Sequence, residues 1–405
     1  MGLWNGLSNC YLKKGEMKIL KLKCWSKRIV QSAAVLSVLS LAVVTPLSVF
    51  ATDELGKNEP RIVQVNNPNF PVALDEQGNV WCFAWHAISV KDGFFTNLMI
   101  KTPDIKDVKS ISQNGGMILA LKKDGTVWTI EKLGVKSNLN EHASVKLGEQ
   151  IPNLKDIVKV DVAGMIGMAI DKHGKVWMFE AAPGMLKDDP IYASLKSEPI
   201  QIEGLEHVTD MLISYDLTFL KEDGSVWNYD GYVSRPSANW SFYDSIRDVK
   251  PVQFKNLKDI VKLGGDHYAL DKDGSVWTWG RTILSKDQDG LAEVPSAPYR
   301  MDGLTDVVDF ASGNDHALFV KKDGTVWGLG YFIEKWGALG AKPERVWKDL
   351  FQLEGIENAA SVKISILSGD LTTESVIKKD GTVWMWGIDQ FLDLVKKPQQ
   401  VEFRN

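Results

Sequence analysis

The sequence predicts an all-β protein, a seven-bladed β-propeller closed by pairing of its N- and C-terminal strands. Three observations predict this fold. A nine-residue motif occurs seven times, its copies are spaced almost evenly, and a strand-like segment follows the last copy at the C-terminus. Because the copies extend over most of the 405 residues, they indicate one repeat architecture rather than several unlike domains.

The repeated motif joins an apolar strand end, a polar turn with glycine and a Val-Trp pair, as in ALDKDGSVW at residues 269–277. A Lys-Asp-Gly turn between apolar runs predicts a hairpin whose glycine takes a positive φ. Because valine precedes each tryptophan and an apolar residue follows two positions later, both faces of the second strand are predicted to be buried. The repeat tryptophans are assigned to the core between blades rather than to a sugar-binding track: Trp81, Trp128, Trp177, Trp227, Trp277, Trp327 and Trp384.

Two further short strands are predicted in each repeat. One lies directly upstream of the hairpin, as at residues 259–263, and a segment that opens with proline, as at residues 251–254, precedes it. Four strands per repeat of about 50 residues are typical of a propeller blade. The first copy lacks the segment that opens with proline, so residues 398–403 at the chain end are expected to complete the first blade and close the ring. An open array would instead need polar caps at both ends.

The first 51 residues are expected to be a signal peptide. A basic segment precedes an apolar run of 16 residues, Ile29 to Val44, and small residues stand at Val49 and Ala51. The run is shorter than the ~20 residues that cross a membrane, so a retained anchor is the lesser alternative. Met17 is an alternative start. Residues 52–59 are then a short linker, and residues 60–405 form the propeller.

Loss of this leader would make the chain more acidic. It would leave 40 basic and 51 acidic side chains, a net charge of −11 in place of −5. A chain this acidic is a poor binder of phosphate groups, so no nucleic-acid partner is expected. Cys82 alone would remain, so no internal disulfide can form. The expected protein is a monomer, secreted or held at the cell surface, with a protein partner and no membrane contact after signal cleavage.

No catalytic residue, cofactor or metal is assigned from the sequence. It contains no nucleophile elbow, zinc-binding HExxH helix or phosphate-binding glycine loop. His267 and His316 each follow a glycine by three residues and are interpreted as hydrogen-bonded within their own blades, a metal or catalytic pair being the alternative. The segment from Asp287 to Glu293 is interpreted as a solvated turn. Calcium binding is the lesser alternative, because the segment lacks the third Asp or Asn and the full 12-residue spacing of a calcium-binding loop.

Two copies resemble the repeat of the regulator of chromosome condensation (RCC1) family: GGDHYALDKDGSVWTWG at residues 264–280 and GNDHALFVKKDGTVWGLG at residues 313–330. The stretch WGALG at residues 336–340 is similar to the family's glycine-leucine-glycine element. The resemblance covers roughly residues 60–403 and implies a seven-bladed propeller that binds proteins.

The family's eukaryotic members include a chromatin-bound exchange factor for a small GTPase, and its secreted bacterial members include inhibitors of β-lactamases. The expected export and the acidic charge depart from the first group, so the chain resembles a secreted bacterial member. The loops between repeats match no motif, and no inhibitory contact residue is transferred. Fold does not by itself fix function.

Aromatic residues outside the repeat register are the candidate binding residues. They follow the hairpin strands in connections longer than the usual ~4–6 residues, and long loops often bind partners. Aromatic side chains are also enriched at interface hot spots, although each could instead pack on its own blade. The prediction is a secreted, non-enzymatic protein-binding propeller, an inhibitor of or scaffold for an extracellular protein. The alternative is an extracellular or cell-wall enzyme that acts on a glycan or peptide at the central funnel. The candidates are Phe94, Phe95, Trp240, Phe242, Tyr243, Tyr331, Phe332 and Trp336.

Overall fold

The structure is a computed structural model in which the chain divides into two units, Met1–Asp53 and Glu54–Asn405, and all described residues lie in the second. The expected signal peptide therefore lies outside the described residues. Within the described part, no helix is long and apolar enough to cross a membrane. The described residues are 59–66, 72–83, 89–91, 94–96, 98–114, 116–132, 145–164, 166–181, 198–213, 217–229, 250–265, 267–279, 281–282, 292–293, 297–336, 343–368, 371–388 and 394–404.

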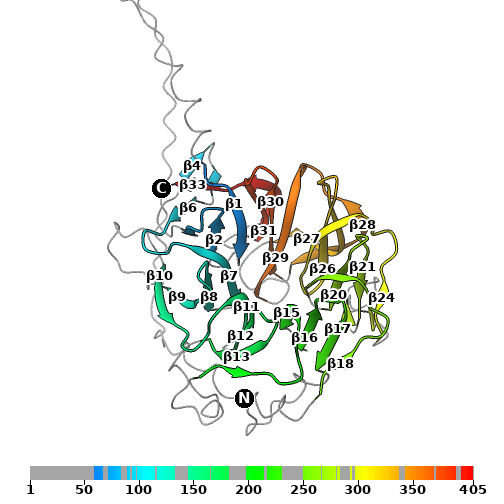
Figure 1. The fold of residues 1–405 in the computed structure, drawn as a ribbon. Coiled ribbons are helices and arrows are strands. Elements are labelled where there is room, and N and C mark those ends of the chain that lie inside the picture. The colour runs from blue at the N-terminus through cyan, green and yellow to red at the C-terminus, as the bar shows by residue number, and fades with distance from the viewer. Residues whose placement is uncertain are drawn as a thin grey trace, which may run out of the picture. The chain divides into compact units, whose positions relative to one another are not determined.

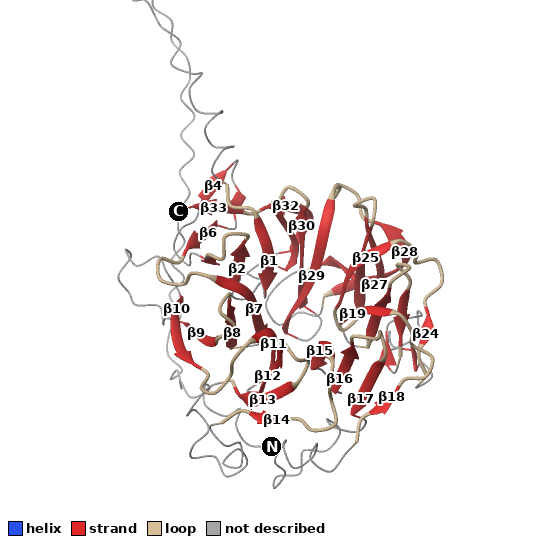
Figure 2. Ribbon diagram, in the orientation of Figure 1, coloured by secondary structure: helices blue, strands red, loops and turns tan. Residues whose placement is uncertain are grey.

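Seven sheets, antiparallel except for the last strand of the first, form the blades of a propeller, and the predicted fold class is confirmed (Figure 1). The first strand of each blade lies nearest the centre and contacts the first strands of both neighbouring blades (Figure 2). The first three blades are β1 (Ile62–Asn66), β2 (Val72–Asp75), β3 (Val80–Phe83) and β6 (Leu98–Lys101); β7 (Val108–Asn114), β8 (Met117–Lys122), β9 (Val127–Lys132) and β10 (Val145–Gln150); and β11 (Ile157–Ala163), β12 (Ile166–Asp171), β13 (Val176–Glu180) and β14 (Ile200–Gln201).

The remaining blades repeat this order of inner strand, hairpin and outer strand. Two small hairpins, β4 (Ser89–Lys91) with β5 (Phe94–Thr96) and β22 (Arg281–Thr282) with β23 (Ala292–Glu293), lie in the connections. Blades four to seven are β15 (Val208–Ile213), β16 (Leu217–Lys221), β17 (Val226–Tyr229) and β18 (Val252–Gln253); β19 (Ile260–Gly264), β20 (Tyr268–Asp271), β21 (Val276–Thr278) and β24 (Tyr299–Arg300); β25 (Val307–Ser312), β26 (His316–Lys321), β27 (Val326–Lys335) and β28 (Glu344–Gln352); and β29 (Ala359–Ser368), β30 (Leu371–Lys378), β31 (Val383–Ile388) and β32 (Leu394–Gln400).

The strand that opens with proline belongs to a different blade from the one predicted. β14 and β18 pair with β13 and β17, so each closes the preceding hairpin as an outer strand. The first blade therefore has its own outer strand, β6, and most of residues 398–403 do not complete it. Pro398 lies in β32 of blade seven, and only β33 (Glu402–Arg404) joins blade one, where it pairs in parallel with β6.

The hairpin glycines join each blade to the next. Each glycine carbonyl accepts a hydrogen bond from the amide that begins the next inner strand, at 2.9–3.2 Å in all seven hairpins. The bond from Ile62 to Gly381 links blade seven to blade one in the same way. Each of these glycines has a positive φ, and a Cβ on Gly174 would lie 2.6 Å from the Cα of His207. The glycine is thus needed for its backbone conformation and for close contact with the next blade.

The repeat tryptophans are anchored in two ways. In three hairpins the indole Nε1 donates to an aspartate six residues earlier, as from Trp277 to Asp271 at 2.9 Å. In the other four, lysine occupies that position and lies over the indole ring, while Nε1 donates to a Thr or Ser hydroxyl two residues earlier. Trp327 is an example, with Lys321 4.4 Å from its ring centroid and Thr325 Oγ1 3.0 Å from Nε1.

Seven apolar clusters lie between successive blades in the described part of the chain. The cluster between blades seven and one contains Ile377 and Val383 from one side and Ile62 and Trp81 from the other. Trp81 is fully buried, whereas the other six repeat tryptophans are half-buried. Burial between blades is the main stabilising term for such a ring, because apolar area removed from water dominates folding.

Candidate functional site

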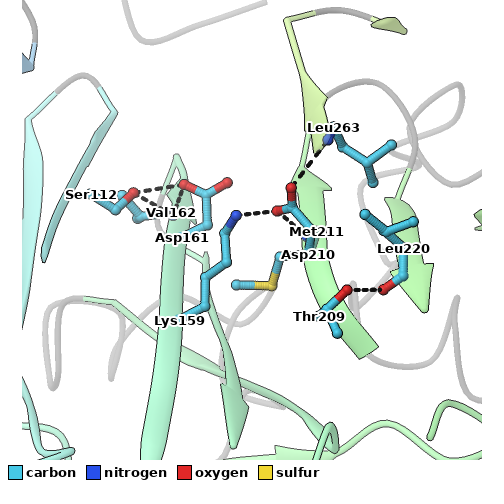
Figure 3. Close-up of polar contacts among 9 residues, drawn as sticks. All are labelled: Ser112, Lys159, Asp161, Val162, Thr209, Asp210, Met211, Leu220 and Leu263. Atoms are coloured by element: carbon cyan, nitrogen blue, oxygen red, sulfur yellow. Dashed lines mark hydrogen bonds and ion pairs between the residues drawn. The ribbon is translucent and has the colours of Figure 1, made fainter. Parts of the chain in front are cut away.

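Charged side chains near the centre of the propeller tie its blades together. The third residues of four successive inner strands are Lys159, Asp210, Lys262 and Asp309, and they form the ion pairs Lys159–Asp210 and Lys262–Asp309 (Figure 3 shows the first). The aspartates also accept hydrogen bonds from backbone amides of the blades that follow, as from Leu263 to Asp210 at 3.1 Å. These carboxylates therefore act as structural links between blades.

A second polar contact at the centre joins blades two and three. Ser112 donates a 2.6 Å hydrogen bond to Asp161 and accepts one from the amide of Val162 at 3.1 Å (Figure 3). Burial raises the pKa of Asp161, and the hydrogen bond from Ser112 opposes that rise. The contacts of the central acids with lysines, amides and hydroxyls are those of a structural core.

The structure brings Tyr331 and Phe332 of the predicted binding residues together on β27, and Trp336 follows at the end of that strand. Phe94 and Phe95 belong to β5, in the connection between β3 and β6 of blade one. The other three predicted binding residues lie outside the described residues: Trp240, Phe242 and Tyr243. Asp287 and Asp289 of the candidate calcium segment also lie outside them.

Beyond Gly330, the paired ends of β27 and β28 form a two-stranded ribbon, which comprises residues 331–335 and 344–348 and is here called the blade-six ribbon. Tyr331 pairs with Trp347 across it, and their rings meet edge to face at 5.2 Å. The Arg345 guanidinium lies 5.6 Å from the centre of the Tyr331 ring. The ribbon thus combines Tyr, Trp and Arg, the residue types most enriched at interface hot spots.

Ion pairs on the ribbon hold its two strands together. Glu334 contacts Lys348 at 2.9 Å, and Lys335 contacts Glu344 at 3.0 Å. The hydrogen bond from Lys348 holds the pKa of Glu334 below its usual range. Surface pairs of this kind add little stability each, but together with the strand pairing they favour one arrangement of the aromatic side chains.

A buried charge network connects blades six and seven beneath the ribbon. His316 is 2% exposed; its Nδ1 lies 3.0 Å from Asp315, and its Nε2 lies 3.0 Å from Glu374 of blade seven without the alignment of a good hydrogen bond. Arg345 donates a 2.6 Å hydrogen bond to Asp315, and Thr372 donates one of 2.7 Å to Glu374. His316 is thus hydrogen-bonded within its own blade through Asp315, as predicted, and it also lies beside Glu374 of blade seven. His267, in contrast, is buried beside Trp279 of its own blade.

The network fixes His316 as a cation. Burial alone would lower the pKa of His316, but the contacts with Asp315 and Glu374 outweigh it and raise the pKa to about 9. Glycines make room for this arrangement. A Cβ on Gly330 would lie 2.7 Å from the His316 Cα, and one on Gly387 would lie 2.4 Å from Glu374 Oε2. The positive charges of Arg345 and His316 balance the negative charges of the Asp315 and Glu374 carboxylates, so the network has no net charge.

A cavity of about 530 Å³, here called the inter-blade cavity, lies between blades six and seven. Phe332, Phe351 and Trp386 contribute to its walls, and His316 and Glu374 reach it from the buried network. Phe332 packs against both neighbours, at 4.8 Å from the His316 ring and 5.1 Å from Phe351. The predicted residue Phe332 thus joins the ribbon to the cavity.

Sequence reasoning missed several residues of this region. Arg345, Trp347 and Phe351 lie in β28, an outer strand without a repeat motif to mark it. Glu374 did carry a signal, because it stands ten residues before its tryptophan within a buried strand, where blade six has Ala317. An acid at such a position indicates a buried partner.

No protein-family model matches the chain. Protein RCC1 of Candida albicans is 23% identical over 254 residues, which is 54% of this chain and 52% of that protein. The human E3 ubiquitin-protein ligase HERC2 is 31% identical over 115 residues, 26% of this chain and 2% of the ligase. The chain thus spans about half the length of the first relative and a small part of the second.

Solved propellers share the fold. Yeast RCC1 (Prp20), solved with Kap60 bound, has a TM-score of 0.55 at 16% identity over 90% of this chain and 91% of its own. Prp20p from Saccharomyces cerevisiae, studied for its binding to Gsp1p and histones, has a TM-score of 0.50 at 19% identity over 72% and 76%. Human WBSCR16 has a TM-score of 0.52 at 15% identity over 76% and 85%.

Proposed function

Because the chain is an RCC1-type repeat propeller, we propose that it is an exported, non-enzymatic protein that captures an extracellular protein through blades six and seven. One observation carries the choice of surface. The blade-six ribbon presents Tyr331, Trp347 and Arg345 together on paired strands. Aromatic and arginine side chains held in one arrangement lose little entropy on binding, so they suit protein recognition.

Two further points support a protein partner. Yeast RCC1 was solved with the protein Kap60 bound, and Prp20p was studied with Gsp1p and histones, so propellers of this fold include protein binders. The central acids of the present chain are engaged with lysines and with backbone groups of neighbouring blades. These points favour binding over the glycan- or peptide-cleaving alternative.

Export is proposed from the N-terminal sequence. The basic, apolar and small-residue order of residues 13–51 is that of a secretory leader, and Cys82, the cysteine that would remain, is buried. The function of capture is to inhibit the partner or to hold it in place. Once the partner is known, its own activity measured with and without the propeller separates these two roles.

A capture experiment tests the proposed surface. The exported protein, purified and immobilised, is mixed with extracellular medium, and retained proteins are compared with those held by Tyr331→Ala/Trp347→Ala. The matched control is Val252→Ala/Val261→Ala, which removes two exposed apolar side chains from blades four and five. We expect the control to retain its partner and the ribbon variant to lose it. Equal capture by both variants, each with an unchanged unfolding midpoint, would refute the assignment to the ribbon.

A further inference from the structure

Aromatic and aliphatic side chains form part of the walls of the inter-blade cavity, beside polar and charged ones. Its volume of about 530 Å³ falls in the range of about 300–1,000 Å³ that is usual for ligand sites. The rings of Phe332, Phe351 and Trp386 line it on the sides of both blades, and Leu394 and Val395 of β32 add aliphatic surface. An apolar side chain placed in this space would lose contact with water, which favours its binding.

The polar groups at the cavity already have opposite charges beside them. His316 lies between Asp315 and Glu374, and Thr372 donates to the same Glu374. Arg345 balances Asp315 from the other side. Because these charges cancel, this end of the cavity favours a neutral group over a charged one.

The rim of the cavity carries three lysines and two glutamates, which gives it a small excess of positive charge. Lys396 and Lys397 are exposed on β32, the outer strand of blade seven, and Lys348 stands opposite on β28. Glu334 is paired with Lys348 and lies close enough to Lys396 for that charge also to lower its pKa, and Glu354 is a second, exposed acid among the lining residues. The whole chain has a net charge of −5, opposite in sign to the charge of these lysines. A local patch of opposite sign steers an acidic partner to one place.

We propose that the inter-blade cavity binds an acidic peptide segment of the partner, with one aromatic or large apolar side chain inserted between the blades and adjacent carboxylates at Lys396 and Lys397. The inference rests on the proposed function, because it specifies which part of the partner blades six and seven recognise. The walls select the inserted side chain, and the lysines select the charges beside it. Neither feature alone would separate this peptide from a neutral apolar one or from an acidic one without an anchor.

Synthetic peptides test the proposal without knowledge of the partner. The probes are fluorescein-labelled Asp-Asp-Trp-Asp-Asp, the same peptide with Ala for Trp, and Lys-Lys-Trp-Lys-Lys, and fluorescence anisotropy measures their binding to the purified protein. The variant is Lys396→Glu/Lys397→Glu, in which both changed side chains are exposed. The control, Lys255→Glu/Lys258→Glu, makes the same change of charge at exposed lysines between blades four and five.

We expect the acidic tryptophan peptide to bind more tightly than the other two and to weaken as salt rises. Inversion of the two rim lysines should weaken it by about tenfold or more, while the control keeps its affinity. Phe332→Ala should weaken the tryptophan peptide and leave the alanine peptide unchanged. If Phe332→Ala fails to fold, Leu394→Ala at the cavity wall replaces it.

Equal binding of the acidic and basic peptides, or equal affinity in the rim variant and the control, would overturn the proposal. So would binding that does not depend on the tryptophan, because the peptide would then act only as an anion. Failure here is separable from failure of the proposed function. A protein that captures its partner in both the rim variant and the control, yet binds no acidic peptide, refutes the cavity assignment and leaves capture by the ribbon intact.

Discussion

The amide nitrogen of Ile62 lies 3.1 Å from the carbonyl oxygen of Gly381, and the hydrogen bond between them joins the first inner strand to the last hairpin. Six other pairs make the same bond between successive blades. The ring is therefore closed at the backbone by the same contact that joins every other pair of blades. The C-terminal strand β33 adds a second, separate contact to that closure.

A glycine that touches the next blade should be harder to replace than one that does not. Gly174 and Gly204 have nearly the same φ, +72° and +79°, but a Cβ on Gly174 would approach His207 backbone atoms, whereas one on Gly204 would meet nothing within 4 Å. Gly204→Ala should lose about 1–2 kcal/mol, the cost of an L-residue in the left-handed region. Gly174→Ala should lose clearly more, measured by urea unfolding. Equal losses would show that close contact between blades is not what requires the glycine.

The turn aspartates should stabilise the protein above about pH 4. Four turn aspartates accept hydrogen bonds from the hydroxyl and the amide of the Thr or Ser two residues later, and these bonds lower their pKa values: Asp124, Asp223, Asp323 and Asp380. The hydroxyl bond is the larger cause for Asp124 and Asp223. The amide bond is the larger cause for Asp323 and Asp380. Because these pKa values are lower in the folded chain than the unfolded value of about 3.9, the contribution is present above that pH and is lost as pH falls below it. Replacement of all four by Asn should therefore lower the unfolding midpoint at pH 7, by an amount that shrinks toward pH 3.

Asp273→Asn is the control for this experiment. It occupies the same turn position in the β20–β21 hairpin, where Asp271 holds the turn and the indole of Trp277. Its effect on the midpoint should be small at each pH. A difference between the wild type and the fourfold variant that stays constant from pH 5 to pH 3 would contradict the prediction.

His316 should stabilise the protein most below about pH 6.5. Its pKa is raised in the folded chain to about 9, so its contribution is complete below the unfolded value and is lost as pH rises through about 9. His316→Gln should be less stable than the wild type at neutral pH by about 3–5 kcal/mol, the usual effect of removing one partner of a buried ion pair. The gap should narrow toward pH 10, as measured by denaturant unfolding.

An NMR titration of the His316 ring provides an independent measurement, with an expected midpoint near 9. His173→Gln, at an exposed hairpin turn, is the control. The difference in stability between this variant and the wild type should be the same at neutral and at alkaline pH. A His316 midpoint near 6.5 would mean that the Asp315 and Glu374 contacts do not hold the proton.

The C-terminal strand should contribute to ring closure. Phe403 packs against Trp81 edge to face at 5.5 Å, and Val401 is 3% exposed in the cluster between blades seven and one. Phe403→Ala should cost about 1–2 kcal/mol, and removal of residues 401–405 should lower the thermal midpoint further. A chain that lacks only residue 405 is the control. An unchanged midpoint after the larger deletion would leave closure to the Ile62–Gly381 contact and its apolar neighbours.

Much of the fold could be predicted because the hairpin signal is local. The motif around Gly274 and Trp277 contains the turn, the anchored indole and the buried valine within nine residues, and seven copies give the number of blades. The partner of the outer strand was not predictable in the same way. β18 is a pair of residues between two hairpins, and its own sequence does not specify which of the two it joins.

The candidate site was predictable only where an aromatic residue follows a repeat motif closely. Tyr331 and Phe332 come four and five residues after Trp327, so their position on the continuing strand follows from the repeat. Trp347 and Arg345 reach the same ribbon from the returning strand, after a connection whose length differs from blade to blade. The pair formed by His316 and Glu374 depends on packing between blades, and no spacing within one repeat reveals it.

The two ways of anchoring the repeat tryptophan make the hairpins interchangeable, provided that one of the two positions supplies an acceptor for the indole nitrogen. An intact hairpin with Asp271 could replace one with Lys321 and Thr325, since both satisfy the indole nitrogen. A chimera with lysine at the first position and Lys175 at the second would leave that nitrogen without an acceptor inside the blade. Any redesign or recombination of these blades must therefore keep aspartate at the first position or a hydroxyl residue at the second, and the hairpin with Asp271 and Ser275 has both.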